Sequence, residues 1–338
     1  MIRTAQFSVA IFPIGNARKE VALAKRAEEM GYDGIWVGDS HVIWRELYVM
    51  LGAIASTTHR VKISPGMTHS QVRHLTLTAS ALISLAELVG ERLRIGFGVG
   101  ASGPGNLGLK PVTTKALGES VATLRDLMNG KPAKIEDREF QIRFGAAERN
   151  IPFFLATSGV STVRLAGRIA EGMILGANRQ DMDTRIAIMR EEARKAGRNT
   201  SDLQVALWLP CSISEDRVFA RNQVKAHVAR SAMSSIARKI AKGEQVSEED
   251  RLATERLQKE YSFYHHMDSE LGNLVPEHWV DHYALAGEPN EVRRRVEELV
   301  AIDGVTELAF VPWGPDREQV LRTLVREVLP NSQNRITT

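Results

Sequence analysis

The sequence predicts an α/β protein in which a parallel sheet closes into a (β/α)8 TIM barrel. Short apolar segments alternate along the chain with longer segments whose apolar residues recur at helical spacing. The short segments are apolar on both faces, which is typical of parallel strands covered by helices. Eight strand–helix units occur in one chain, more than a doubly wound open sheet usually contains. We therefore expect one barrel domain over residues 1–338, interrupted by two insertions.

The expected strands are short runs rich in Ile, Val, Leu and Phe. They lie at Gln6–Ile11, Gly34–Asp39, Val61–Ser64, Leu93–Val99, Phe153–Ala156, Gly172–Leu175, Gln204–Leu209 and Glu307–Val311.

Capping residues and glycines mark the helices between these strands. Asn16 can cap the first helix, whose apolar spacing continues to Met30 before Gly31 ends it. His74 stands at the start of another helix, where a capping or core role is favoured over catalysis. The other helices are expected at Leu47–Thr57, Leu75–Val89, Thr114–Met128, Ser161–Ala170, Asp183–Lys195 and Asp316–Val328.

Two stretches do not fit the alternation of strand and helix. Residues 131–150 alternate apolar and polar side chains and predict a small hairpin. Residues 215–287 are charge-rich and mostly helical, with Ser247 at a helix start. We expect this longer insertion to cover the substrate side of the barrel. Its aromatic residues would line a pocket or pack in a dimer interface, and the interface is favoured: Tyr261, Phe263, Tyr264 and Trp279.

The composition indicates a globular protein, with 43% hydrophobic and 25% charged residues. A formal net charge of +3 is too small for a general nucleic-acid binder. The single cysteine, Cys211, cannot form an internal disulfide. The chain opens without signal-peptide architecture, and its most apolar stretch, Leu75–Val89, contains too many polar residues for a membrane span. We expect a soluble cytoplasmic protein with neither nucleic acid nor membrane as partner.

Asp39 and His41 stand where the second expected strand ends. In a barrel the carboxyl ends of the strands carry the active site. The two residues are an acid/base pair or ligand contacts in one interpretation. In the other, Asp39 caps the following loop.

The turn that follows the fifth strand predicts an anion site. Gly159 lets the chain approach a ligand closely, and Ser158 and Ser161 add hydroxyl groups. The N–H groups at the start of the next helix point at the same place, which favours phosphate. A plain helix N-cap without a ligand is the alternative.

Two other motifs are weaker evidence for a ligand or metal site. The run Gly98–Gly103 matches the dinucleotide fingerprint, but residues 104–108 that follow are not expected to open a helix, as that fingerprint requires. Gly98 and Gly100 are better explained as backbone that leaves room for a flat ligand. His278 and His282 are spaced as a metal pair, yet Trp279 stands where the zinc-protease pattern has Glu, so no metal is predicted.

Several of these segments together resemble the luciferase-like flavin-dependent oxidoreductases. Within that superfamily the chain is most similar to the methylenetetrahydromethanopterin reductase branch, which uses the deazaflavin coenzyme F420. The resemblance covers about residues 1–215 and the last barrel unit. It rests on Gly34–Asp39, Tyr48–Ala55, Ile63–Thr68 with Arg73 and His74, Glu91–Gly100, Ile151–Ala156 and Ala166–Leu175.

The resemblance implies a barrel, often dimeric, that binds its cofactor across the top. Asp39 and His41 would lie near the ring, although the branch has Asp and His adjacent and here Ser40 separates them. A bulge with a cis peptide bond at Gly66–Met67 would back the ring. The residues that would contact the cofactor are Ser64, Gly66, Met67, Thr68, Gly98, Gly100, Ser158, Gly159, Val160, Ser161, Gly176, Ala177 and Asn178.

Hydride transfer between coenzyme F420 and a small organic substrate is the function that follows, with Asp39 or His41 managing a proton. The alternative keeps the fold and uses FMN in a two-component monooxygenase, with a flavin reductase as partner. A third possibility is a barrel that only binds a flavin and catalyses nothing. A homodimer or a higher homo-oligomer is expected.

Overall fold

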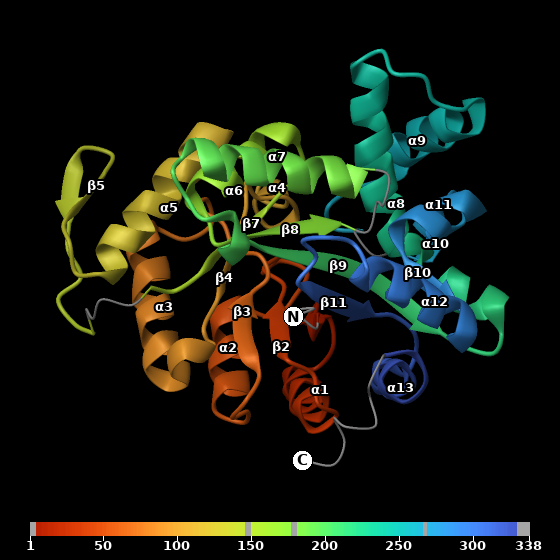
Figure 1. The fold of residues 1–338 in the computed structure, drawn as a ribbon, viewed down its shortest axis with the longest axis horizontal. Helices are drawn as coiled ribbons and strands as arrows, with labels where there is room; N and C mark the ends of the chain where they lie inside the picture. Colours follow the sequence, from red (N-terminus) through yellow and green to blue (C-terminus); the bar gives the residue numbers. More distant parts are fainter. Residues whose placement is uncertain (1–4, 146–149, 177–180, 266–268, 330–338) are drawn as a thin grey trace.

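The computed structural model describes residues 5–145, 150–176, 181–265 and 269–329 (Figure 1). Its parallel strands run in the order β3-β2-β1-β11-β9-β8-β7-β4. Their bounds are β1 Gln6–Ile11, β2 Gly34–Val37, β3 Lys62–Pro65, β4 Ile95–Phe97, β7 Phe153–Ala156, β8 Gly172–Gly176, β9 Gln204–Ile213 and β11 Glu307–Pro312.

The two end strands of that order, β3 and β4, meet and close the barrel. Parallel bridges join Ile63 to Leu93 and Thr68 to Phe97. The N–H of Arg94 also donates to the carbonyl of Ile63 at 3.0 Å. The predicted (β/α)8 fold is therefore confirmed, with strands at all eight expected places.

The helices lie outside the strands, as Figure 1 shows for α1, α2 and α3. Asn16 caps α1 as expected, since its side chain accepts from the N–H of Arg18. His74 is the N-cap of α3, which confirms the capping role. The barrel helices are α1 Ala17–Glu29, α2 Leu47–Ala55, α3 Leu75–Val89, α5 Thr114–Met128, α6 Val160–Ile169, α7 Met182–Lys195, α12 Pro289–Val300 and α13 Arg317–Thr323, the last continued by a π-helical turn, Leu324–Val328. Within the described ranges, none of the helices is long and apolar enough to cross a membrane.

The shorter of the two additional segments is a hairpin beside α5. Strand β5 (Ala133–Ile135) pairs antiparallel with β6 (Arg138–Phe140).

The longer one has a hydrophobic cluster of its own, which includes Val228, Leu257 and Trp279. Its helices are α8 Arg217–Ala241, α9 Glu248–Glu260, α10 Ser269–Gly272 and α11 Glu277–Tyr283. A short strand that the sequence analysis missed, β10 (Leu285–Gly287), pairs in parallel with the end of β9. The reason is that β9 extends beyond β8, so its last residues have a free edge.

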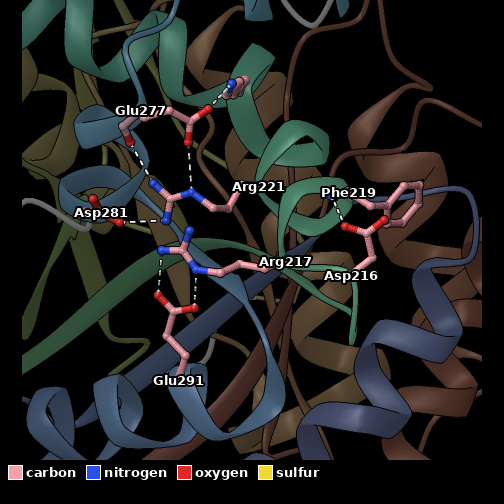
Figure 2. Close-up of polar contacts among 8 residues, drawn as sticks. Asp216, Arg217, Phe219, Arg221, Glu277, Asp281 and Glu291 are labelled. Atoms are coloured by element: carbon pink, nitrogen blue, oxygen red, sulfur yellow. Dashed lines mark hydrogen bonds and ion pairs between the residues drawn. The ribbon is translucent and has the colours of Figure 1, made fainter.

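Ion pairs fasten α8 to the elements that follow it (Figure 2). The buried guanidinium of Arg221 donates to the carboxylates of Glu277 and Asp281 at 2.9 and 2.7 Å. Arg217 donates to Glu291 of α12 at 3.1 Å. These contacts hold α8 and α11 against the barrel wall.

The barrel interior contains a buried ion pair near the start of the strands. Arg94 Nη1 donates to Glu307 Oε2 at 2.5 Å, and both residues are at most 2% exposed. Trp36 Nε1 donates to the other oxygen of Glu307 at 2.8 Å. Burial opposes the charged form of Glu307, but the charge and hydrogen bonds of Arg94 outweigh it and lower the pKa of that carboxyl.

Removing only the positive member should be costly. We expect Arg94→Met to lower the free energy of unfolding at pH 7 by about 3 kcal/mol, because Glu307 would stay buried without its counter-charge. Urea denaturation measures the loss. The double variant Arg94→Met/Glu307→Gln should recover part of it, and equal stability of the two variants would contradict the ion-pair explanation. Since Glu307 has a lowered pKa when folded, its contribution is present above pH about 4.3 and is lost as the pH falls further.

Candidate active site at the barrel rim

The carboxyl ends of the strands face the long insertion, as the arrowheads of β8, β9 and β11 show in Figure 1. The insertion also contacts the loops at this rim. A Cβ atom at Gly105 would lie 2.4 Å from the ring of Phe263, and Tyr264 Oη donates to the carbonyl of Asn106 at 3.2 Å. Trp279 was expected to line a pocket or to pack in a dimer interface. It does neither, because it is 1% exposed inside the hydrophobic cluster of the insertion.

Asp39 lies just beyond β2, and its carboxylate forms an ion pair with Arg73. Arg73 Nη1 and Nη2 donate to its two oxygens at 2.7 and 3.1 Å, and Thr68 Oγ1 donates at 2.8 Å. Arg73 also donates to Glu46 at the protein surface. Burial would lower the pKa of Arg73, but its bonds and charge interactions with Asp39 and Glu46 raise it. The negative charge of the Asp39 carboxylate is thus balanced by Arg73 inside the protein.

Two histidines lie near this carboxylate. His69 is 3% exposed, its Nε2 is 4.0 Å from Asp39 Oδ2, and neither ring nitrogen has a hydrogen-bond partner among the described residues. Burial lowers the pKa of His69 and outweighs the opposing effect of Asp39. His41 is half-buried, and its Nδ1 has no partner within the same ranges. Ser40, between Asp39 and His41, shares a hydrogen bond of 2.8 Å with Ser102.

The predicted bulge after β3 has the expected backbone. The Gly66–Met67 peptide bond is cis, which confirms that prediction. Thr68 continues the bulge and bonds to Asp39, whereas Ser64 lies deeper and accepts from Arg94 Nε at 3.3 Å. The structure therefore brings Asp39, Thr68 and the bulge together.

Gly98 and Gly100 have local structural reasons of their own. A Cβ at Gly98 would approach Ala156 to 3.2 Å, and Gly100 has φ +85°. The expectation that no helix opens after them is wrong, because α4 (Ser102–Gly105) forms one turn there. Proline is compatible with a first helical turn, which needs no N–H donor at that position. A turn of four residues in a closed barrel still does not make a dinucleotide fold.

The turn after β7 presents a helix N-terminus at the rim. The N-cap of α6 is Gly159, so no side chain covers the N–H groups of its first turn. Ser158, Val160 and Ser161 are exposed, and a Cβ at Gly159 would meet nothing within 4 Å. The N-cap is therefore neither Ser nor Thr. Thr162 Oγ1 accepts from the N–H of Gly159 at 3.3 Å, and the N–H groups that follow have no side-chain cap and are suited to an anion.

Arg185 lies beside this turn and also pairs with Asp181 at 3.8 Å. Arg185 Nη1 donates to the carbonyl of Thr157 at 3.2 Å. Burial, followed by the charges of Arg185 and Arg230, lowers the pKa of Arg238. Gly176 ends β8 nearby and is exposed, while the predicted contacts Ala177 and Asn178 lie outside the described residues.

The sequence analysis missed several rim residues. Arg73 and His69 were not assigned roles, although a buried Asp after a strand should have prompted a search for its cation. The aromatic residues Trp208 and His227, far apart in the chain, carried no signal of proximity. His278 is engaged with Asp250 at 2.8 Å, and no group of three metal-ligating side chains occurs in the described part of the chain.

A closed parallel barrel with a helix N-terminus after one strand and titratable side chains after two others is typical of an enzyme whose active site lies at the carboxyl ends of the strands. The chain belongs to the luciferase-like monooxygenase family, whose model matches residues 3–307.

Known relatives match this protein over almost the whole length of its chain. The 5,10-methylenetetrahydromethanopterin reductase of Methanolobus tindarius is 26% identical, over 96% of this chain and 99% of its own. The structure of the coenzyme F420-dependent tetrahydromethanopterin reductase of Methanopyrus kandleri superposes with a TM-score of 0.80 at 24% identity, covering 96% of this chain and 98% of that one. An F420-dependent secondary alcohol dehydrogenase, solved with an F420–acetone adduct, gives 0.78 at 17% identity, covering 99% and 100%.

Proposed function

We propose that this protein is a cytoplasmic oxidoreductase that transfers a hydride between coenzyme F420 and a small organic substrate. The observation that carries the proposal is the uncapped N-terminus of α6 at the rim, on the same face as the Gly66–Met67 bulge and Asp39. The relatives named above support the choice of coenzyme.

The residues at the rim fit the coenzyme. Its phosphate would bind the N–H groups at the start of α6, where Gly159 leaves open space and Arg185 lies next to the turn. Ser158, Val160 and Ser161 would complete that contact. Its ring would lie against Gly66, Met67 and Thr68, and Gly98 and Gly100 would contact it through their backbone.

When bound, the coenzyme supplies two-electron hydride transfer at its ring. Oxidation of an alcohol releases one hydride from carbon and one proton from oxygen, so the protein must accept or pass on that proton. His41 has a ring nitrogen, Nδ1, with no partner among the described residues for this role, and Asp39 would hold the cation Arg73 near the ring. The insertion that closes onto α4 would exclude water.

FMN-dependent monooxygenation, with a flavin reductase as partner, is the second candidate. The description of the matching family favours it, and the same anion site would take the FMN phosphate. Binding without catalysis, the third possibility, would appear as cofactor affinity without turnover.

A negative charge at residue 158 should change cofactor binding and helix stability in opposite directions. We expect Ser158→Asp to weaken coenzyme F420 binding at least tenfold, because the new carboxylate would repel the phosphate, while an acid at a helix N-terminus stabilises the helix. Cofactor fluorescence titration measures affinity, and thermal denaturation measures stability. Ser158→Asn, which is uncharged and of equal size, should stay within threefold of the wild type. Titrating wild type with FMN in parallel decides between the two cofactors, since tighter FMN binding would make the monooxygenase the leading function.

Variants at the two predicted catalytic residues test the proton role. Asp39→Asn and His41→Ala should each lower turnover more than tenfold while changing coenzyme affinity by less than threefold. Stopped-flow reduction of the bound coenzyme gives the rate, and the titration above gives the affinity. Wild-type turnover in both variants would remove these residues from the mechanism.

We also propose a homodimer formed through α2 and α3, which lie side by side in Figure 1. Val49 of α2 is 69% exposed, and Leu77 and Leu88 of α3 are each 59% exposed. Helix α2 has no charged residue and α3 has only Glu87, so this outer face is unusually apolar for one in water.

A charge on that face should prevent association. We expect sedimentation equilibrium to find wild type as a dimer and Leu77→Glu as a monomer. Val218→Glu is the matched control, because Val218 is 67% exposed on α8, away from that face. A monomeric wild type would exclude the dimer.

A further inference from the structure

Four aromatic residues from distant parts of the chain meet at one arc of the rim. Phe12 follows β1, Trp208 belongs to β9, Trp313 follows β11 and His227 comes from α8. The ring of Phe12 lies 5.9 Å from that of Trp208, 6.2 Å from that of Trp313 and 5.5 Å from that of His227, the last pair being stacked. His227 and Trp313 are 5.7 Å apart. These rings form one continuous apolar frame, which we call the aromatic arc.

Polar atoms of this frame lack partners. Trp208 Nε1, Trp313 Nε1 and His227 Nδ1 are buried and make no hydrogen bond within the described ranges. A buried polar atom left unpaired costs about 1–3 kcal/mol, and most are therefore paired in native proteins. Three such atoms in one cluster of rings around Phe12 indicate a site for a polar group that the described residues do not supply.

The frame carries no charge of its own. Burial lowers the pKa of His227 to about 4, so its imidazole is neutral at pH 7. The indole groups are permanent neutral donors, and the neutral imidazole is donor or acceptor according to its tautomer. The arc is therefore matched to an uncharged oxygen with apolar surroundings, since a buried ion would need a counter-charge.

The position of the arc places such a ligand next to the proposed coenzyme ring. Strands β1, β11 and β9 are consecutive in the barrel, whereas the bulge follows β3 and the anion site follows β7. Trp208 spans the two regions, because a Cβ at Gly66 would lie 2.9 Å from its Cζ2. This step rests on the proposed function.

We propose that Trp208, Trp313 and His227 form the substrate subsite and that the substrate is an uncharged, mainly apolar alcohol or ketone whose oxygen binds their ring nitrogens. Anionic groups would be held at the start of α6 beside Arg185, two strands away from Trp208, and are not what this subsite selects.

Cyclohexanol is a suitable probe, because it offers one neutral oxygen on an apolar ring. Its binding is measured by quenching of tryptophan fluorescence, with and without bound coenzyme F420. Trp208→Phe and Trp313→Phe keep the aromatic surface and remove one donor each, so each should weaken binding about fivefold. Cyclohexanecarboxylate, of similar shape but charged, should bind at least tenfold more weakly than cyclohexanol. Tyr32→Phe, which removes a hydroxyl that donates to the carbonyl of Leu321 at 3.0 Å outside the arc, should leave the affinity within twofold.

The outcomes separate this inference from the function on which it rests. Affinities in Trp208→Phe and Trp313→Phe within twofold of wild type, equal binding of the carboxylate, or no binding of cyclohexanol would each overturn the subsite. Failure of the coenzyme to bind would overturn the proposed function instead, while cyclohexanol binding to the coenzyme-free protein would still decide for or against the arc. Steady-state kinetics with cyclohexanol give a second readout. Loss of a binding donor should raise KM for cyclohexanol more than it lowers kcat.

Discussion

The packing of the barrel interior depends on the Arg94–Glu307 ion pair. Once the two charges are buried, each needs the other, because an unpaired buried charge is strongly unfavourable. The guanidinium of Arg94 lies 4.4 Å from the centre of the Trp36 ring, and the indole nitrogen of Trp36 is bound to Glu307. The largest side chain of the interior is thus fixed from two directions.

The position of Trp36 in turn decides where side chains are impossible. A Cβ at Gly66 would lie 2.9 Å from Trp36 Cβ, and one at Gly96 would lie 3.0 Å from Trp36 Cζ3 and 2.5 Å from the carbonyl of Pro65. Glycine at these positions lets the backbone of β3 and β4 approach the barrel axis. The bulge that reaches the rim at Gly66 is therefore set by packing against the interior, and the site inherits its shape from the ion pair beneath it.

The sequence predicted what depends on local periodicity and missed what depends on pairing across the chain. Strands, helix caps such as Asn16 and the barrel itself follow from patterns within a few residues. Arg94 and Glu307 are 213 positions apart, and no local pattern reveals such a pair. Strand β10 was missed because it forms only beside the overhanging end of β9, a pairing that no local pattern reveals. The aromatic arc combines four elements, and only the closed barrel brings them together.

The charges at the rim are distributed in a way that suits hydride transfer. A hydride carries negative charge, so an uncompensated buried carboxylate beside its path would oppose the transfer. Arg73 neutralises Asp39 through two hydrogen bonds, and His69 next to it is kept neutral by burial. Ser40, bonded to Ser102, separates Asp39 from His41 along the chain and leaves the imidazole free of that carboxylate. In the proposed site, Arg185 and the N–H groups of α6 would supply positive charge where the coenzyme phosphate binds, whereas the aromatic arc on the substrate side carries no charge.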